Sequence, residues 1–209
     1  MGLKKSGPAK DGLREVIERE YPRDLDGLLA QLRDGDVDQR RWAARDLMSH
    51  PESAPYLGAH LTGESASSVR EAIFTTLEGL PGEATVAALL PLLRSDDAML
   101  RNGAIESLTG MPDFVAPKIA ALLHDADPDV RIFTVNLLGD LQHHQVPQWL
   151  RRVLLEESAV NVVAAAIEVL AEVGSPEDLE ALQSAKARFA ADPFVGFAAD
   201  MAAQRIEAA

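Results

Sequence analysis

Apolar residues recur at intervals of three and four along most of the chain, the spacing that places them on one face of an α-helix. Leu25, Leu28 and Leu32 are one example. The apolar stretches are separated by residues that favour tight turns, such as Asp34-Gly35 and Pro81-Gly82. The pattern therefore predicts a series of short amphipathic helices joined by short turns.

The helical segments repeat about every 30 residues. In four copies an arginine is followed seven residues later by a leucine, and a fifth copy has Val163 and Leu170 in these two places. A second helical pattern lies between successive copies, so each unit is predicted to be a helical hairpin. A hairpin of this size buries its apolar face only by stacking on its neighbours. The four arginines are Arg40, Arg70, Arg101 and Arg131.

The predicted fold class is all-α, a right-handed α-solenoid of about five to six stacked helical hairpins. Residues 1–10, rich in Lys, Gly, Ser and Pro, are expected to be a flexible tail. Residues 11–209 are expected to form a single solenoid. Within it, we expect a capping helix over 11–21, repeats over 24–175 and a C-terminal cap over 176–209.

Three of the repeats begin with Asp-x-x-x-Arg, and the full pattern, in which a small or apolar helix follows and ends in Gly or Asp, is clearest from Asp127 through Arg131 to Gly139. This pattern resembles the HEAT-repeat family, in particular the short bacterial phycobilisome-lyase type, which is armadillo-like. The resemblance covers about residues 24–175 and implies an α-solenoid. It leaves function open, since such repeats serve scaffolds, lyase subunits and DNA glycosylases.

The chain is acidic and has no cysteine. It carries 20 Lys and Arg against 33 Asp and Glu, a formal net charge of −13. Such a body repels phosphate backbones and anionic lipid surfaces, so neither nucleic acid nor a membrane is expected as a partner. The missing thiols exclude disulfides, thiolate metal sites and cysteine nucleophiles. With no signal peptide or long apolar run in the sequence, the expected localisation is cytoplasmic.

Three aspartates stand four residues before a repeat arginine. An aspartate at the start of a helix caps free amides and also lies within reach of a side chain one turn later. We therefore expect each aspartate and arginine to form a working pair in a structural ladder that links adjacent repeats, with ligand binding as the alternative. The predicted structural residues are Asp36, Arg40, Arg70, Asp97, Arg101, Asp127 and Arg131.

The second helix of each hairpin has an exposed stripe at positions one, five, and eight or nine after the arginine. The family resemblance implies that this helix lines the concave surface of the solenoid. The stripe is basic in the first repeat and acidic afterwards, which fits a partner protein with a basic segment. A solvated helix face is the alternative. The predicted partner-binding residues are Arg41, Arg45, Glu71, Thr75, Glu78, Asn102, Glu106, Thr109, Asn136, Asp140, Glu168 and Glu172.

The few aromatic residues are expected mainly in the core, since they fill the space between repeats. This group comprises Trp42, Phe74, Phe133 and Trp149, the last with the outer face as its alternative. The C-terminal segment is unusually apolar. We expect it to pack onto a helix over 177–190, with a homodimer face as the alternative. Its apolar residues are Phe189, Phe194, Phe197, Met201 and Ile206.

No catalytic, cofactor or metal motif is recognised, so no cofactor is expected. Asp125, Asp127 and Asp129 open like a Ca²⁺ loop, but Val130 replaces the required glycine and Asn136 replaces the bidentate glutamate. His143-His144 with Asp140 would supply too few ligands for a metal site and is expected to be a solvated turn.

The predicted function is a non-catalytic protein-interaction scaffold. The alternative is a lyase-like subunit that handles a bilin or a modified protein, which requires an apolar groove of bilin size. A nucleic-acid enzyme resembling HEAT-like alkylpurine DNA glycosylases is a third possibility. It requires a cationic groove with aromatic walls, whereas the predicted stripe is acidic from Glu71 onward.

Overall fold

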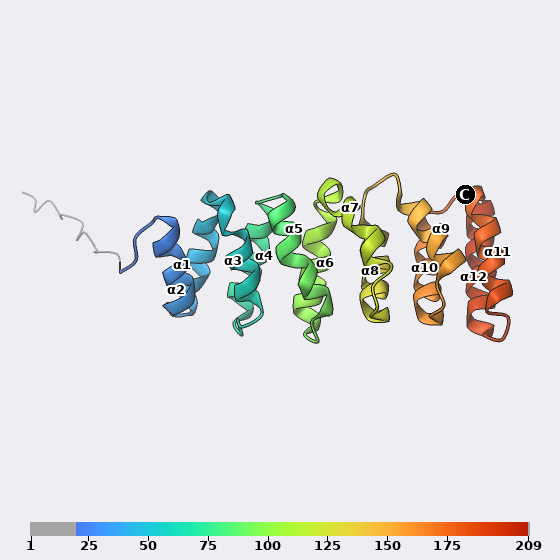
Figure 1. Ribbon diagram of the computed structural model, residues 1–209, viewed down its shortest axis with the longest axis horizontal. Helices are drawn as coiled ribbons and strands as arrows, with labels where there is room; N and C mark the ends of the chain where they lie inside the picture. The colour runs from blue at the N-terminus through green and yellow to red at the C-terminus, as the bar shows by residue number, and fades with distance from the viewer. Residues whose placement is uncertain (1–19, 209) are drawn as a thin grey trace, which may run out of the picture.

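The computed structural model describes residues 20–208, and this part of the chain contains twelve α-helices and no strand. The helices pair into six hairpins that follow one another along a rod (Figure 1). The first helices of the hairpins are α1 (Leu25–Asp34), α3 (Ala54–Leu61), α5 (Glu83–Leu89), α7 (Pro112–Leu122), α9 (Val146–Glu156) and α11 (Leu179–Arg188). The second helices are α2 (Val37–Asp46), α4 (Ser67–Glu78), α6 (Ala98–Thr109), α8 (Pro128–Asp140), α10 (Val160–Val173) and α12 (Pro193–Ala208).

Short 3₁₀ segments flank several helices. Proline lies at the start of most of them, where its missing N–H costs no helical hydrogen bond. Leu47–Ser49 continues α2, Pro51–Ser53 precedes α3, Leu90–Arg94 follows α5, and Pro176–Asp178 precedes α11. Three of the four segments therefore adjoin first helices, whereas the second helices are α-helical over ten to sixteen residues.

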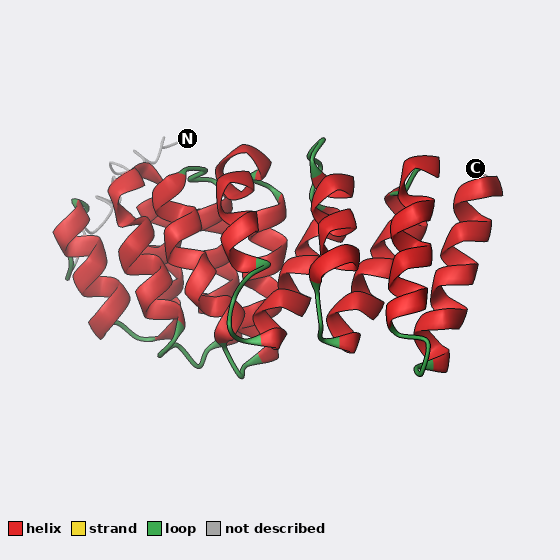
Figure 2. Ribbon diagram, turned by 45° about the vertical axis from the view of Figure 1, so that its right-hand side comes forward, coloured by secondary structure: helices red, strands yellow, loops and turns green. Residues whose placement is uncertain are grey.

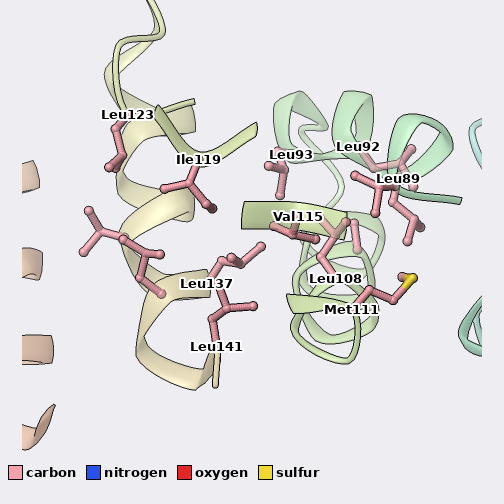
Figure 3. Packing of buried hydrophobic residues seen from close by; sticks show 14 of the residues in the cluster. Leu89, Leu92, Leu93, Leu108, Met111, Val115, Ile119, Leu123, Leu137 and Leu141 are labelled. Carbon is pink, nitrogen blue, oxygen red and sulfur yellow. The ribbon is translucent and has the colours of Figure 1, made fainter. Parts of the chain in front are cut away.

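The second helices contact one another in chain order, from α2 through α4, α6, α8 and α10 to α12. The core lies between them and the first helices. The leucine seven residues after the repeat arginine is fully buried in every copy: Leu47, Leu77, Leu108, Leu138 and Leu170 are each 0% exposed. Figure 3 shows this packing where α5, α6, α7 and α8 meet. The predicted fold class, an all-α solenoid of stacked hairpins, is confirmed.

The repeat aspartates cap the second helices. Asp36 accepts a hydrogen bond from the N–H of Gln39, and the Gln39 side chain accepts from the N–H of Asp36, which completes a capping box. Asp97 and Asp127 likewise accept from the second amide of α6 and α8. These caps define where each second helix begins, and Figure 2 shows the loops gathered along the two long edges of the rod.

The expected N-terminal elements lie mostly outside the described residues, whereas the expected C-terminal cap lies almost wholly within them. The predicted tail over 1–10 and most of the predicted capping helix over 11–21 lie outside the described residues. Residues 20 and 21, the last two of that predicted helix, are bends. At the other end, residues 176–208 form the sixth hairpin, which packs against α9 and α10. None of the helices within 20–208 has the length and apolar character needed to cross a bilayer.

Candidate functional site

A buried carboxylate in the turn of the second hairpin binds the first hairpin. Arg40 donates from Nε and Nη2 to the two carboxylate oxygens of Glu64, at 2.8 and 2.9 Å. The same carboxylate accepts from the N–H of Ala66 at 2.8 Å and lies 3.1 Å from Nε2 of His60. The Glu64 side chain is 2% exposed. The hydrogen bonds from Arg40 lower its pKa from 4.5 to about 2, so the carboxylate is charged at neutral pH.

An ion pair of this kind spans every junction between neighbouring hairpins in the described chain. At each of the five junctions, an arginine of one hairpin contacts a carboxylate of the next, and we call this series the junction ladder. Its pairs are Arg40–Glu64, Arg70–Asp97, Arg94–Asp125, Arg131–Glu157 and Arg151–Asp178. Arg94 is half exposed, so water screens its pair more than the others.

The expectation that each repeat aspartate pairs with the arginine four residues later is wrong. The oxygens of Asp36 and Asp127 are directed to backbone amides at the start of their helices. Asp97 does bind an arginine, but this is Arg70 of the preceding hairpin, at 2.7 Å. That contact and the N–H of Met99 lower the pKa of Asp97. The ladder therefore runs between hairpins rather than within one helical turn.

The repeat arginines also tie down their own turns. Arg40 donates to the carbonyl of Gly35, at 3.0 Å, and Arg131 to that of Asp125, at 2.7 Å. Arg70 and Arg101 do the same to the carbonyl oxygens six residues before them. Arg101 alone among the four contacts a ring instead of a carboxylate, and its guanidinium lies 4.4 Å from the centre of the Phe133 ring.

The predicted stripe lies on the stacked second helices. Ten of its twelve residues are exposed, and only Arg41 and Thr109 are half-buried. In the first repeat, Arg41 contacts Asp38 at 3.1 Å, which offsets part of the basic character there. Because α2, α4, α6, α8 and α10 contact one another in order, their stripe residues follow each other along one side of the rod.

A hollow of about 530 Å³ lies between α4 and α6, and we call it the α4–α6 hollow. Phe74 and Gly103 lie side by side in it. A Cβ atom on Gly103 would come within 2.6 Å of the Phe74 ring, so only glycine lets the ring lie this close to α6. Five stripe residues share the hollow: Glu71, Thr75, Glu78, Asn102 and Glu106.

A second hollow, of about 440 Å³, lies between α10 and α12, and we call it the α10–α12 hollow. Its lining is mainly apolar, with Glu168 of the stripe and Arg205 as its charged residues. The apolar lining residues are Ile167, Ala171, Ala198, Met201 and Ala202. The remaining stripe residues line neither hollow: Arg41, Arg45, Thr109, Asn136, Asp140 and Glu172.

The aromatic residues divide between core and surface. Phe74 is buried and Phe133 is half-buried, but the expectation of a core position for Trp42 is wrong, since 54% of it is exposed. In the third hairpin, the residue two places after the repeat arginine is Gly103, and it packs against Phe74 of the preceding hairpin. Trp42 has the same position in the first hairpin. No described hairpin precedes α2, so the equivalent Trp42 is left uncovered.

The C-terminal apolar residues also divide. Ile206 is buried and Phe189 is half-buried, whereas Phe194, Phe197 and Met201 are exposed on α12, at 55%, 66% and 49%. These three residues are spaced by three and four, so they lie on one face of the helix. The last hairpin thus presents an apolar strip that its own first helix does not cover.

No cluster of three or more potential metal ligands occurs within residues 20–208. Helix α8 ends at Asp140, so His144 does not share a helix face with it. The His143 ring instead stacks on Trp149, with centroids 5.1 Å apart and planes 12° apart. Asp125, the first residue of the calcium-like run, contacts Arg94. Asp125 and His143 therefore each have a side-chain contact within the protein.

Most carboxylates of the junction ladder were not predicted from the sequence. Glu64, Asp125 and Glu157 each stand six residues before the arginine position of their own repeat, at Arg70, Arg131 and Val163. That shared offset is the signal that identifies them. Two ladder arginines were also not predicted: Arg94, at the end of the 3₁₀ segment after α5, and Arg151, on α9.

The sequence matches a known repeat family over most of its length. HEAT repeats match residues 25–109 and 115–193. Among solved structures, an engineered protein is 19% identical with a TM-score of 0.42, covering 87% of this chain and 95% of its own. A designed armadillo repeat protein is 16% identical with a TM-score of 0.39, covering 88% and 100%. No curated protein sequence matches. With HEAT repeats over most of its length, the chain belongs to the HEAT-repeat family.

Proposed function

We propose that this protein is a non-catalytic interaction scaffold that holds a basic segment of a partner protein on the stripe of its second helices. The observation that carries the proposal is that the stripe carboxylates are almost all without an ion pair within residues 20–208. Within the described chain, only one of the six forms an ion pair, and that contact, from Glu172 to Arg205, is 3.9 Å long. The others are Glu71, Glu78, Glu106, Asp140 and Glu168.

The contrast with the junction ladder supports this proposal. Glu64, Glu157 and Asp178 are buried or half-buried, and each faces an arginine at 2.7–2.9 Å. Their charges are compensated within the protein. The stripe carboxylates are exposed, and their charges add to the local negative potential. A repeated row of such charges attracts a cationic segment over long range and raises its association rate.

A solvated helix face would show the same exposure, so the test is binding. The probe is a fluorescent peptide of eight residues, alternating arginine and serine. The binding variant is Glu71→Lys/Glu106→Lys/Glu168→Lys. The matched control, Glu52→Lys/Glu83→Lys/Glu180→Lys, changes the net charge equally at exposed residues of the first-helix side. Fluorescence anisotropy at low and high salt gives the affinities.

We expect the stripe variant to weaken peptide binding by tenfold or more at low salt, on the order of 1.4 kcal/mol. The control should weaken it far less, because its changes lie away from the stripe. Equal losses in the two variants would show that only net charge matters, and the proposed site would then be wrong.

A further inference from the structure

The α4–α6 hollow has the chemistry to hold an arginine side chain. Glu71 and Glu106 form no ion pair in the described chain, and both line the hollow beside the Phe74 ring. A guanidinium pairs with carboxylates through two parallel hydrogen bonds, and its stem and plane pack on an aromatic ring. Arg70 also lines the hollow, but its guanidinium already donates to Asp97 and to the Glu64 carbonyl. Its positive charge is therefore compensated locally.

The α10–α12 hollow suits a different kind of side chain, an apolar one. Its apolar lining includes Ile167 and Met201, and Met201 is 49% exposed. Covering such a surface with an aliphatic or aromatic side chain removes apolar area from water, worth about 25 cal/mol per Å². A cationic residue would gain less here, since Glu168 is the only carboxylate among the described lining residues and the positive charge of Arg205 lines the same hollow.

The surface next to the α4–α6 hollow, between α6 and α8, is filled by a side chain. At the position two residues after the repeat arginine, α6 has Gly103 but α8 has Phe133, and Arg101 covers that ring at 4.4 Å. The hollows are therefore separate anchor points, three helix-to-helix steps apart along the rod. At the usual 8–10 Å per packed helix pair, the separation is roughly 24–30 Å. An extended chain covers it with about seven to nine residues.

We propose that the partner segment is bipartite, with an arginine in the α4–α6 hollow and an apolar side chain in the α10–α12 hollow, joined by about seven to nine extended residues. This inference rests on the proposed function, because it takes the stripe as the binding surface. It adds an apolar anchor and a defined spacing between the two anchors. A partner that bound only to the acidic stripe would need neither.

The test uses peptides with a single arginine, separated from a terminal Trp-Leu pair by Gly-Ser spacers of three, nine and twenty residues, in both chain directions. We expect the nine-residue spacer to bind about tenfold more tightly than the same peptide with Ala-Ala in place of Trp-Leu, because the second contact is then intramolecular. The three-residue spacer should give no gain, because it is too short to reach. The twenty-residue spacer should give an intermediate gain.

Two variants assign the anchors. Ala171→Trp fills the α10–α12 hollow and should abolish the gain from Trp-Leu while leaving the arginine–serine probe unaffected. Asn102→Trp fills the α4–α6 hollow and should weaken both kinds of peptide. Ala87→Trp, at an exposed residue of α5, is the matched control. Thermal unfolding verifies that each variant folds, and Ala198→Trp serves as the second filling variant for the α10–α12 hollow.

The outcomes separate the two proposals. If the arginine–serine probe binds the stripe but the Trp-Leu pair adds nothing at any spacing, the bipartite proposal is wrong and the proposed function stands. A gain that survives both Ala171→Trp and Ala198→Trp would also overturn it. If the probe itself does not bind, both proposals are wrong.

Discussion

Arg40 and Glu64 form a doubly hydrogen-bonded ion pair between the first and second hairpins, at 2.8 and 2.9 Å. The carboxylate is almost fully removed from water, so its charge depends on this arginine. Removing one partner would leave a buried charge without compensation, which costs more than the pair itself contributes. The contact therefore makes the first junction sensitive to pH and to substitution.

Acid should destabilise the protein through Glu64. Its pKa is lowered to about 2 in the folded chain, so the stabilisation it gives is complete above its usual 4.5 and is lost as the pH falls toward 2. The shift corresponds to about 3 kcal/mol. Urea unfolding at several pH values should show this loss in the wild type. Glu64→Gln should be less stable at pH 7 and should lose less on acidification. An unchanged pH dependence in this variant would contradict the assignment.

The repeat arginines should contribute unequally to stability, because Arg131 belongs to the junction ladder and Arg101 does not. Arg131→Ala breaks two hydrogen bonds to the half-buried Glu157, at 2.7 and 3.1 Å, and should cost roughly 2–4 kcal/mol. Arg101→Ala removes a ring contact and one carbonyl bond, and should cost roughly 1–2 kcal/mol. Thermal unfolding measures both. Neither variant should change the affinity of the arginine–serine probe, and a change for Arg101→Ala without a lower Tm would indicate a binding role.

Two glycine-to-alanine substitutions should have opposite effects, because one glycine lies in the close contact between α4 and α6 and the other has open space around it. Gly103→Ala places a Cβ within 2.6 Å of the Phe74 ring and should destabilise the protein by about 1–3 kcal/mol. Gly196, inside α12, has no neighbouring atom within 4 Å of its added Cβ. Gly196→Ala should stabilise by roughly 0.5–1 kcal/mol, through helix propensity. Equal effects would show that the α4–α6 contact is not tight.

The repeat and its core could be predicted from the sequence because both are periodic. The buried leucine seven residues after the arginine identifies the packed face of each second helix, and helical geometry gives the exposed face. The carboxylates of the ladder lie in turns, where no periodicity relates Glu64 or Glu157 to their arginines. Only comparison of the turns between repeats gives the shared offset of six residues.

Two errors have one physical cause. The prediction that Asp36 pairs with Arg40 took account of one helix only, whereas Arg40 contacts the next hairpin. Treating Trp42 as a core residue assumed a covering neighbour, whereas no described hairpin precedes α2. The contact of Arg40 and the exposure of Trp42 both depend on how the hairpins stack. The spacing of apolar residues in a single helix does not show this stacking. The two hollows were missed for the same reason, since each forms between helices of neighbouring hairpins.

The exposed strip on α12 gives a test of the homodimer that the sequence left as the alternative for this segment. A self-association face formed by Phe194, Phe197 and Met201 would make the molecular mass depend on concentration. Light scattering after size exclusion should then show a dimer that Phe197→Ser converts to monomer. The control is Phe114→Ser, at an exposed residue of α7. A wild-type monomer at high concentration would show that the strip does not pair two copies.

The most direct test of the stripe as a binding surface locates a bound peptide. The arginine–serine probe carries one photoreactive residue, and mass spectrometry identifies the cross-linked helices. We expect cross-links on the second helices, mainly at exposed residues of α4, α6 and α10. Cross-links confined to first helices such as α5 and α9 would contradict the account.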